Sequence, residues 1–246
     1  MVAAHDAVVV GSGPNGLIAA IEIARAGFSV HVVEARDEPG GGMRTAELTL
    51  PGYLHDVCYA CHPFGVLSQA FRNLPLERHG LQWVRPSVSV AHPLDDQPAV
   101  LLQRSLAATA ADLGADARTY ERLLAPFVRG GHALLDDLLG PLRLPRHPWS
   151  MARFGLLGLL PATRFARIAF RDERARALLA GCAGHSILPL SQPLTTAVGL
   201  IFALSGHLDE WPVARGGSGT IVRALVAHLE SLGGTVETGR HVSRID

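Results

Sequence analysis

The sequence opens on an apolar run that leads directly into a glycine turn, and this pair constrains the fold more than any other feature. The run covers residues 6–10, and the turn is Gly11-Ser12-Gly13-Pro14-Asn15-Gly16. An Ala-rich amphipathic stretch and a second apolar run, Val30–Val33, follow before the acid Glu34. Strand, G-x-G-x-x-G turn, helix, strand and acid in this order indicate a β-α-β dinucleotide-binding unit.

The residues of this unit have distinct physical roles. Gly11 permits the tight turn, Gly13 lets backbone N–H groups approach a pyrophosphate, and Gly16 lets helix and strand pack closely. We expect Glu34 to accept hydrogen bonds from ribose hydroxyls and to repel a 2′-phosphate, which favours FAD or NAD over NADP. A glycine turn without a ligand is disfavoured because every part of the pattern stands in register. Pro14 and Asn15 complete the set of predicted cofactor contacts in the turn.

A second glycine-rich segment follows Glu34 at once. It runs Glu34-Ala35-Arg36-Asp37-Glu38-Pro39-Gly40-Gly41-Gly42-Met43-Arg44. Small residues with fixed cations suit a loop along a diphosphate, where arginine makes charge-assisted hydrogen bonds. An ordinary solvated turn is the alternative. The predicted cofactor contacts in this segment are Arg36, Gly41, Gly42 and Arg44.

Together, these segments resemble the FAD-dependent oxidoreductase superfamily that includes amine oxidases and phytoene desaturases. The similarity extends to the phytoene dehydrogenase-like branch through residues 51–56 (PGYLHD) and 211–219 (WPVARGGSG). The resemblance implies that FAD is the cofactor and that the segment after Glu34 contacts it. It also implies that Val242 holds the adenine ring through its backbone. The middle of the chain carries no motif that we can match.

The order of patterns predicts an α/β fold in which a Rossmann-like FAD/NAD(P)-binding domain carries an inserted β-plus-helical substrate lobe. We expect the first segment of the FAD domain at 1–80, the lobe at 81–210 and the second FAD segment at 211–246. Within the lobe, strands at 82–85, 88–92 and 99–102 predict a β-meander. Helical patterns follow, among them 66–73 just before the lobe and 151–160, 163–180 and 194–205 within it.

Composition excludes several kinds of function. The net charge is zero, so no basic excess is available to displace the counterions of a nucleic acid. All 22 basic residues are arginine, so this chain supplies no Schiff-base or P-loop lysine. The three cysteines, and an N-terminus without a basic segment before its apolar run, favour a reduced cytoplasmic setting. We expect no bound metal.

Residues 58–62 form the motif Cys58-Tyr59-Ala60-Cys61-His62, which has three interpretations. C-x-x-C-H is the haem c attachment pattern, but that attachment requires an exported chain. A redox-active disulfide beside the flavin would make the protein a flavin-linked disulfide reductase using Cys58 and Cys61. Two small thiols in a loop near the cofactor are the interpretation we favour.

His185 is the candidate for a catalytic residue, because histidine titrates near neutrality and can act as a general base. A structural histidine in a tight turn is the favoured alternative. The apolar helical lobe around it suits either the roof of an apolar substrate cleft, a peripheral contact with a membrane surface, or a plain core.

The sequence therefore predicts a flavin-dependent oxidoreductase that transfers hydride from an apolar small-molecule substrate to FAD. Beside the disulfide reductase, the remaining alternative is a catalytically silent chain that binds a nucleotide or a partner. The resemblance also implies a second FAD segment beyond Asp246, so we expect a longer enzyme of which this is the N-terminal portion. The oligomeric state, the electron acceptor and the substrate's identity stay open.

Overall fold

The computed structural model describes residues 4–245, which form two compact units. Unit 1 contains the residues up to His62, the segment Asn73–Val84 and the residues from Val213 on. Unit 2 contains Pro63–Arg72 and Arg85–Pro212. No helix within the described residues is long and apolar enough to cross a membrane.

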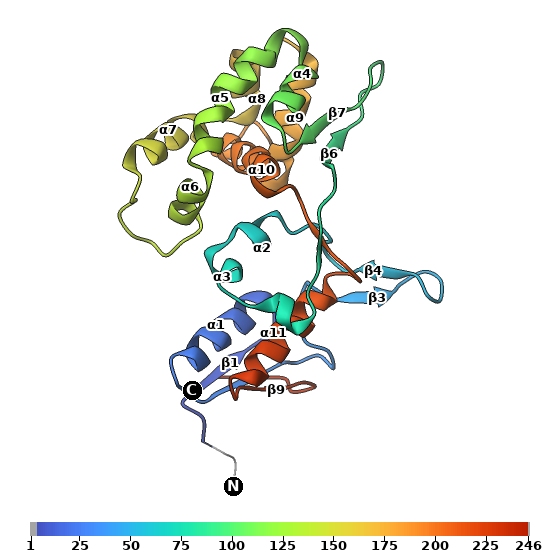
Figure 1. Cartoon of the computed structure of the whole chain (residues 1–246), viewed down its shortest axis with the longest axis vertical. Helices are drawn as coiled ribbons and strands as arrows, with labels where there is room; N and C mark the ends of the chain where they lie inside the picture. Colours follow the sequence, from blue (N-terminus) through green and yellow to red (C-terminus); the bar gives the residue numbers. More distant parts are fainter. Residues whose placement is uncertain (1–3, 246) are drawn as a thin grey trace. The chain divides into compact units, whose positions relative to one another are not determined.

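Unit 1 is built on a parallel sheet of three strands in the order β1-β2-β9 (Figure 1). β1 (Ala7–Val10) pairs with β2 (Val30–Val33), and β2 pairs on its other side with β9 (Thr235–Glu237). The central strand β2 is buried almost throughout, in keeping with its run of β-branched residues. The predicted Rossmann-like α/β fold is confirmed, with a strand from the far end of the sequence beside β2.

Helix α1 (Pro14–Arg25) connects β1 to β2, and it packs against α11 (Gly219–Ser231), from the other end of the sequence (Figure 1). Leu17, Ala20 and Ile21 of α1 are fully buried. Pro14 stands at the first turn, where its fixed φ suits a helix and its missing N–H costs nothing. Arg25 ends the helix, and a cation there complements the helix dipole.

Further short elements complete unit 1. β3 (Thr45–Glu47) and β4 (Leu54–Asp56) form an antiparallel hairpin, with Pro51-Gly52 in the turn between them. A 3-10 helix, η1 (Leu76–His79), packs on α11. β5 (Trp83–Val84) pairs antiparallel with β8 (Val213–Ala214).

Unit 2 is mostly helical. It contains the antiparallel pair β6 (Val88–His92) and β7 (Val100–Gln103). Its helices are α2 (Pro63–Leu67), α3 (Gln69–Arg72), α4 (Leu106–Ala111), η2 (Gly114–Asp116), α5 (Ala117–Arg129), α6 (Gly131–Leu138), α7 (Pro148–Gly158), α8 (Ala162–Ala169), α9 (Glu173–Ala183), η3 (Gly184–Ser186) and α10 (Thr195–Asp209).

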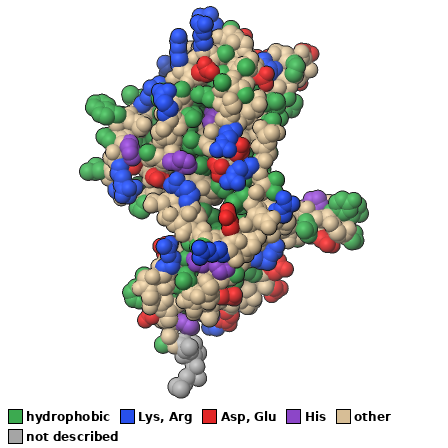
Figure 2. All heavy atoms as spheres, viewed as in Figure 1, with side chains coloured by type: hydrophobic (Ala, Val, Ile, Leu, Met, Phe, Trp, Pro, Cys, Tyr) green, Lys and Arg blue, Asp and Glu red, His purple; other side chains and the backbone are tan. Residues whose placement is uncertain are grey.

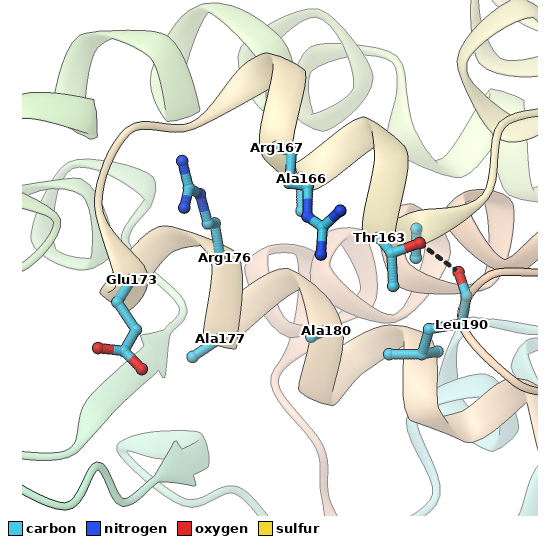
Figure 3. A pocket seen from close by; sticks show the side chains of 9 residues that line it. Thr163, Ala166, Arg167, Glu173, Arg176, Ala177, Ala180 and Leu190 are labelled. Carbon is cyan, nitrogen blue, oxygen red and sulfur yellow. Dashed lines mark hydrogen bonds between the residues drawn. The ribbon is translucent and has the colours of Figure 1, made fainter.

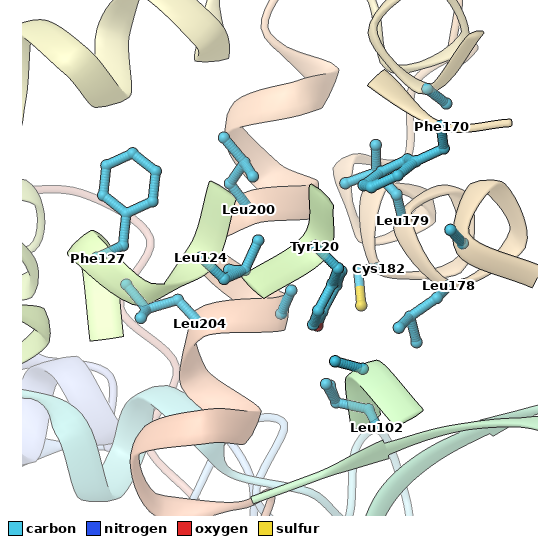
Figure 4. Close-up of a cluster of buried hydrophobic side chains, with 14 of the residues drawn as sticks. Leu102, Tyr120, Leu124, Phe127, Phe170, Leu178, Leu179, Cys182, Leu200 and Leu204 are labelled. Atoms are coloured by element: carbon cyan, nitrogen blue, oxygen red, sulfur yellow. The ribbon is translucent and has the colours of Figure 1, made fainter. Parts of the chain in front are cut away.

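The core of unit 2 forms around α10, whose apolar surface faces its neighbours on several sides. Glycines allow the close approach. A Cβ at Gly199 would lie 3.0 Å from Leu179, and one at Gly158 would lie 2.9 Å from Ala197. Figure 4 shows the cluster, whose members from α5, α9, α10 and their surroundings include Leu102, Tyr120, Leu124, Phe127, Phe170, Leu178, Leu179, Cys182, Leu200 and Leu204.

Three sequence predictions about unit 2 and its surroundings are wrong. The β-meander does not form, because β5 pairs with β8 and leaves β6 and β7 as a pair of their own. The single helix at 163–180 is two helices, α8 and α9, separated at Phe170-Arg171-Asp172. The predicted helix at 66–73 is likewise divided into α2 and α3. The hydrophobic periodicity of the sequence does not reveal these breaks, because the residues on both sides of each break keep the helical pattern.

The break between α8 and α9 is held by a buried carboxylate. Asp116 is 1% exposed, and one of its oxygens accepts hydrogen bonds from Arg171 N (2.8 Å) and Asp172 N (2.7 Å). Asp116 stands at the N-cap position of α5, but its side chain makes no cap hydrogen bond to that helix. Its partners lie far along the chain, where no local pattern announces them.

We expect Asp116→Ala to destabilise the protein by roughly 1–3 kcal/mol, because it leaves two partly buried backbone N–H groups without their acceptor. Urea unfolding followed by circular dichroism measures this loss. Asp112→Ala is the matched control, because Asp112 is exposed and its side chain is not needed for the break. Equal stability of the two variants would contradict this role of Asp116.

Candidate functional site

The glycine turn between β1 and α1 requires the glycines found there. Gly11 has φ +96°, a conformation that favours glycine, and its N–H donates to Val33 O at 2.8 Å. A Cβ at Gly16 would lie 2.1 Å from the carbonyl oxygen of Gly11. The first helical turn can therefore approach the strand only without a side chain at Gly16.

The N-terminus of α1 is open to a ligand. Gly13 is the N-cap residue and makes no side-chain cap bond, and the first turn carries no acid. Nothing lies within 4 Å of the place where a Cβ at Gly13 would stand. Uncapped N–H groups and the positive end of the helix dipole are the features that bind phosphate.

Glu34 directly follows β2 and points at the glycine turn. It is 8% exposed. Its Oε2 accepts from Ser12 N at 3.0 Å and from Ser12 Oγ at 2.6 Å, and its Oε1 accepts from Arg36 N at 3.0 Å. Glu34 therefore fixes the glycine turn through Ser12. It also lies at the end of β2, where a ribose-binding acid is predicted.

The ionisation of Glu34 is set by two opposed effects. Burial acts to raise the pKa of the carboxyl, and hydrogen bonds from Ser12, Arg36 and Ala35 act to lower it. The hydrogen bonds prevail, so the pKa of Glu34 lies below its usual value. Glu34 is a carboxylate at neutral pH, which suits an acceptor for hydroxyl groups.

The second glycine-rich segment folds onto the turn. Gly40 N donates to Ser12 Oγ at 3.2 Å, and a Cβ at Gly41 would lie 3.2 Å from Gly13 Cα. Arg44 Nε donates to Gly41 O at 2.9 Å, so this cation closes the loop on itself. Arg36 keeps an exposed side chain. The structure thus brings both predicted glycine segments into contact.

The C-terminal part of the chain returns beside Glu34. Glu34 N donates to Glu237 O, and Arg240 N donates to Glu34 O, both at 2.8 Å. Val242 follows two residues later, half-buried, and its backbone pairs with none of the described residues. Its predicted role toward adenine stays a prediction.

A second glycine-rich helix start, at α11, is closed. Asp56 Oδ1 accepts from Ser218 N at 2.7 Å, and Thr45 Oγ1 accepts from Gly219 N at 2.9 Å. Thr45 in turn donates to Asp56 Oδ1 at 2.7 Å. A Cβ at Gly217, where φ is +89°, would lie 2.5 Å from Thr45 Oγ1. The hairpin β3-β4 thus caps α11, which leaves this helix end without room for an anion.

His62 belongs to the same buried network. It is 3% exposed and lies 2.9 Å from Ser218 Oγ through its Nε2. Because the Ser218 hydroxyl donates to Tyr59 O at 2.8 Å, the ring must donate from Nε2. Burial lowers the pKa of His62 to about 4, against an opposing effect of Asp56. Sequence reasoning missed this role, since it considered His62 only as part of a haem motif.

Cys58 and Cys61 are free and exposed thiols. A Cβ at Gly42 would lie 3.6 Å from Cys58 Sγ, so this thiol does stand beside the glycine loop. Burial raises the pKa of Cys61, and the charge of Asp56 raises it further. A reactive thiol needs the opposite shift.

His185 lies in an aromatic cluster of unit 2. Its ring stacks on Phe202, with centroids 4.1 Å apart and planes at 13°, and meets Trp211 edge-on at 5.2 Å. Partial burial lowers its pKa. The aromatic contacts account for a histidine at this position, and its catalytic role stays a prediction.

Comparison with known proteins gives one family match and several relatives. A family described as an NAD(P)-binding Rossmann-like domain matches residues 9–74. A hydroxyneurosporene desaturase of Cereibacter sphaeroides is 30% identical over 97% of this chain and 50% of that protein. A lycopene-forming phytoene desaturase of Paracoccus sp. is 26% identical over 99% of this chain and 50% of that protein. The chain thus spans about half the length of these relatives.

Solved structures show the same fold. A putrescine oxidase bound to putrescine matches 96% of this chain and 51% of its own, with a TM-score of 0.59 and 19% identity. At this identity the likeness concerns the fold alone.

The lowered pKa of Glu34 predicts that the stability of the protein depends on pH. A depressed carboxyl pKa contributes stability that is present above the unfolded-state value and is lost as pH falls through the folded-state value. We expect Glu34→Gln to unfold about 1–3 kcal/mol more easily than the wild type at pH 7, with the difference shrinking as the pH falls below about 4. Urea titrations at several pH values measure it. A difference that is constant with pH would contradict the assignment.

The lowered pKa of His62 leads to a second prediction about stability. Between pH 6.5 and about 4 the unfolded chain binds a proton that the folded chain does not. The free energy of unfolding therefore decreases as the pH is lowered through this window. We expect His62→Gln, which keeps a donor for Ser218, to remove up to about 1.4 kcal/mol of this loss per pH unit. The exposed His241→Gln is the control and keeps the wild-type slope.

Proposed function

We propose, from the relation of this chain to phytoene desaturases, that it forms part of a flavin-dependent oxidoreductase and binds FAD through unit 1. The chain contains a Rossmann-like FAD/NAD(P)-binding domain and shares its fold with amine oxidases. In the proposed reaction, an apolar substrate gives up a hydride to the flavin. Bound FAD would supply the electron-accepting chemistry, and the protein's residues would bind and orient it.

The observation that carries this proposal is the contrast between two helix starts in unit 1. Both α1 and α11 begin in glycine-rich segments. At α11 the carboxylate of Asp56 and the hydroxyl of Thr45 already occupy the N–H groups. At α1 no side chain caps the helix, and a Cβ at Gly13 would meet no atom within 4 Å. Of these two helix starts, α1 offers the site that a diphosphate needs.

The predicted contacts then have separate tasks. Gly13 and Asn15 would present backbone N–H groups to the diphosphate. Glu34 would accept the ribose hydroxyls, because its ionised oxygens lie at the end of β2. Gly41 and Gly42 would let the loop pass close to the cofactor, since neither carries a side chain. A ribose acid of this kind favours FAD or NAD over NADP.

Direct binding tests the proposal. The purified chain is titrated with FAD, NAD and NADP by calorimetry, and any flavin retained on purification is read from its visible absorbance. We expect FAD to bind and NADP not to bind. Gly16→Ala should weaken the binding of FAD at least tenfold, because the new Cβ would lie 2.1 Å from Gly11 O and displace α1. Glu34→Gln is a second, milder variant with an expected loss of about tenfold, the equivalent of one charged hydrogen bond.

Gly155→Ala is the matched control, since a Cβ at this helical glycine of α7 would meet nothing within 4 Å. It should bind FAD as the wild type does. Binding of NAD without FAD, or equal FAD affinity in all variants, would overturn the proposal. Cys58→Ser distinguishes this function from that of a flavin-linked disulfide reductase. If the reduction of the flavin by a dithiol requires Cys58, the disulfide reductase is favoured over hydride transfer from an apolar substrate.

A further inference from the structure

A cavity of about 500 Å³ opens in unit 2 between α8, α9 and the loop 187–194 (Figure 3). Cavities of this volume hold small molecules. The cofactor contacts predicted in unit 1 do not belong to its lining. Its walls include Ala162, Thr163, Ala166, Ala177, Ala180 and Leu190.

Hydrogen bonds fix the wall that Leu190 contributes. Leu190 O accepts from Thr163 N at 3.1 Å, from Thr163 Oγ1 at 3.3 Å and from Thr195 Oγ1 at 3.2 Å. Thr163 belongs to α8, and the fully buried Thr195 begins α10. The loop is therefore tied to two helices, and the protein's own contacts shape the cavity. A preformed cavity of this kind reduces the ordering that binding requires.

Arg167 supplies a free cation beside the cavity. Its side chain is exposed and extends from α8 toward α9 in Figure 3. It forms no hydrogen bond and no ion pair with any residue from 4 to 245. Arg176, which also lines the cavity, is engaged, because its Nε and Nη2 donate to Phe170 O at 3.0 and 2.9 Å. The guanidinium of Arg167 therefore keeps its donors for a ligand.

The charges around the cavity favour a negatively charged ligand. Residues 138–171, which include all of α8, contain six arginines and no aspartate or glutamate, in a chain whose net charge is zero. Figure 2 shows basic side chains standing out from the surface of the helical part. Glu173 is the acid of the cavity lining, and Figure 3 shows it at the end opposite Leu190, with its carboxylate directed away from Arg167. An anion at Arg167 is therefore attracted more than it is repelled.

We propose that this cavity binds a small apolar monocarboxylate, with the carboxylate on Arg167 and the apolar body against the alanines of α8 and α9. A guanidinium and a carboxylate form two parallel charge-assisted hydrogen bonds. The alanine and leucine side chains of the lining stabilise an apolar body by removing it from water. The inference concerns unit 2 alone and does not depend on the cofactor proposal.

The same lining explains why the ligand carries a single charge. Arg167 pairs with one carboxylate, and further charges on the ligand would lie unpaired beside apolar side chains. A charge that loses water without gaining a partner is costly. Phosphates and dicarboxylates are therefore poor ligands for this cavity.

Calorimetric titration of the whole chain tests the proposal with three probes. Octanoate has both the charge and the apolar body, acetate has the charge alone, and 1-octanol has the body alone. We expect octanoate to bind with a Kd of about 1 mM or lower, at least tenfold more tightly than acetate or 1-octanol. Octanoate should also raise the midpoint of thermal unfolding, since a ligand that binds only the folded chain stabilises it.

Substitutions at the cavity locate the site. Arg167→Gln removes the charge and should weaken the binding of octanoate at least tenfold, whereas Arg167→Lys keeps the charge and should retain most of the affinity. Ala180→Leu places a larger side chain in the cavity and should also weaken the binding at least tenfold. Glu173→Gln removes the acid of the lining and should strengthen the binding about twofold.

Matched controls carry the same changes outside the cavity. Arg164→Gln alters an exposed arginine of the same helix that does not line the cavity. Ala107→Leu enlarges an exposed alanine of α4. Both variants should bind octanoate as the wild type does. Circular dichroism checks that every variant is folded.

The proposal fails on any of three results. They are the absence of octanoate binding, binding of 1-octanol as tight as that of octanoate, and wild-type affinity for octanoate in both Arg167→Gln and Ala180→Leu. A loss of affinity in Arg164→Gln equal to that in Arg167→Gln would also contradict the assigned site. Loss of FAD binding with octanoate binding intact would affect only the cofactor proposal.

Discussion

The buried carboxylate of Glu34 is the contact on which unit 1 depends. It joins three segments that are separate in sequence: the turn through Ser12, the second strand that it ends, and the glycine loop through Ser12 and Gly40. A buried carboxylate without donors would be costly, and the three N–H and O–H donors around it remove that cost. The turn is therefore shaped by the protein itself, before any ligand arrives. Preorganisation of this kind reduces the entropy lost on binding.

The two glycine-rich helix starts show that the same composition serves two purposes. Glycines at α11 let the β3-β4 hairpin approach, and Asp56 acts there as a cap supplied by a distant strand. Glycines at α1 keep the helix end clear. What differs is a partner elsewhere in the chain. A glycine-rich segment before a helix is thus evidence for close approach, and its surroundings decide whether a backbone or a phosphate approaches.

The sequence predicts those parts of the fold that depend on residues close together in the chain. Strand, turn, helix and acid in the first 34 residues predict the β-α-β unit because each has its own composition signal. Pairing between distant segments leaves no such signal. The place of β9 beside β2, the loss of the β-meander to β5-β8 pairing and the buried networks of Asp116 and His62 all depend on partners more than 50 residues away. Ser12 was missed although Glu34 lies only 22 residues away, because nothing in the sequence shows that the two side chains meet.

Net charge is an average, and the helical unit shows how much an average conceals. A total of zero argues against nucleic acid as a partner of the whole chain, since binding requires a basic excess. Yet residues 138–171 hold six positive charges without one negative charge. Electrostatic attraction is screened within about 10 Å in salt, so a partner that meets this surface experiences the local charge and little of the total.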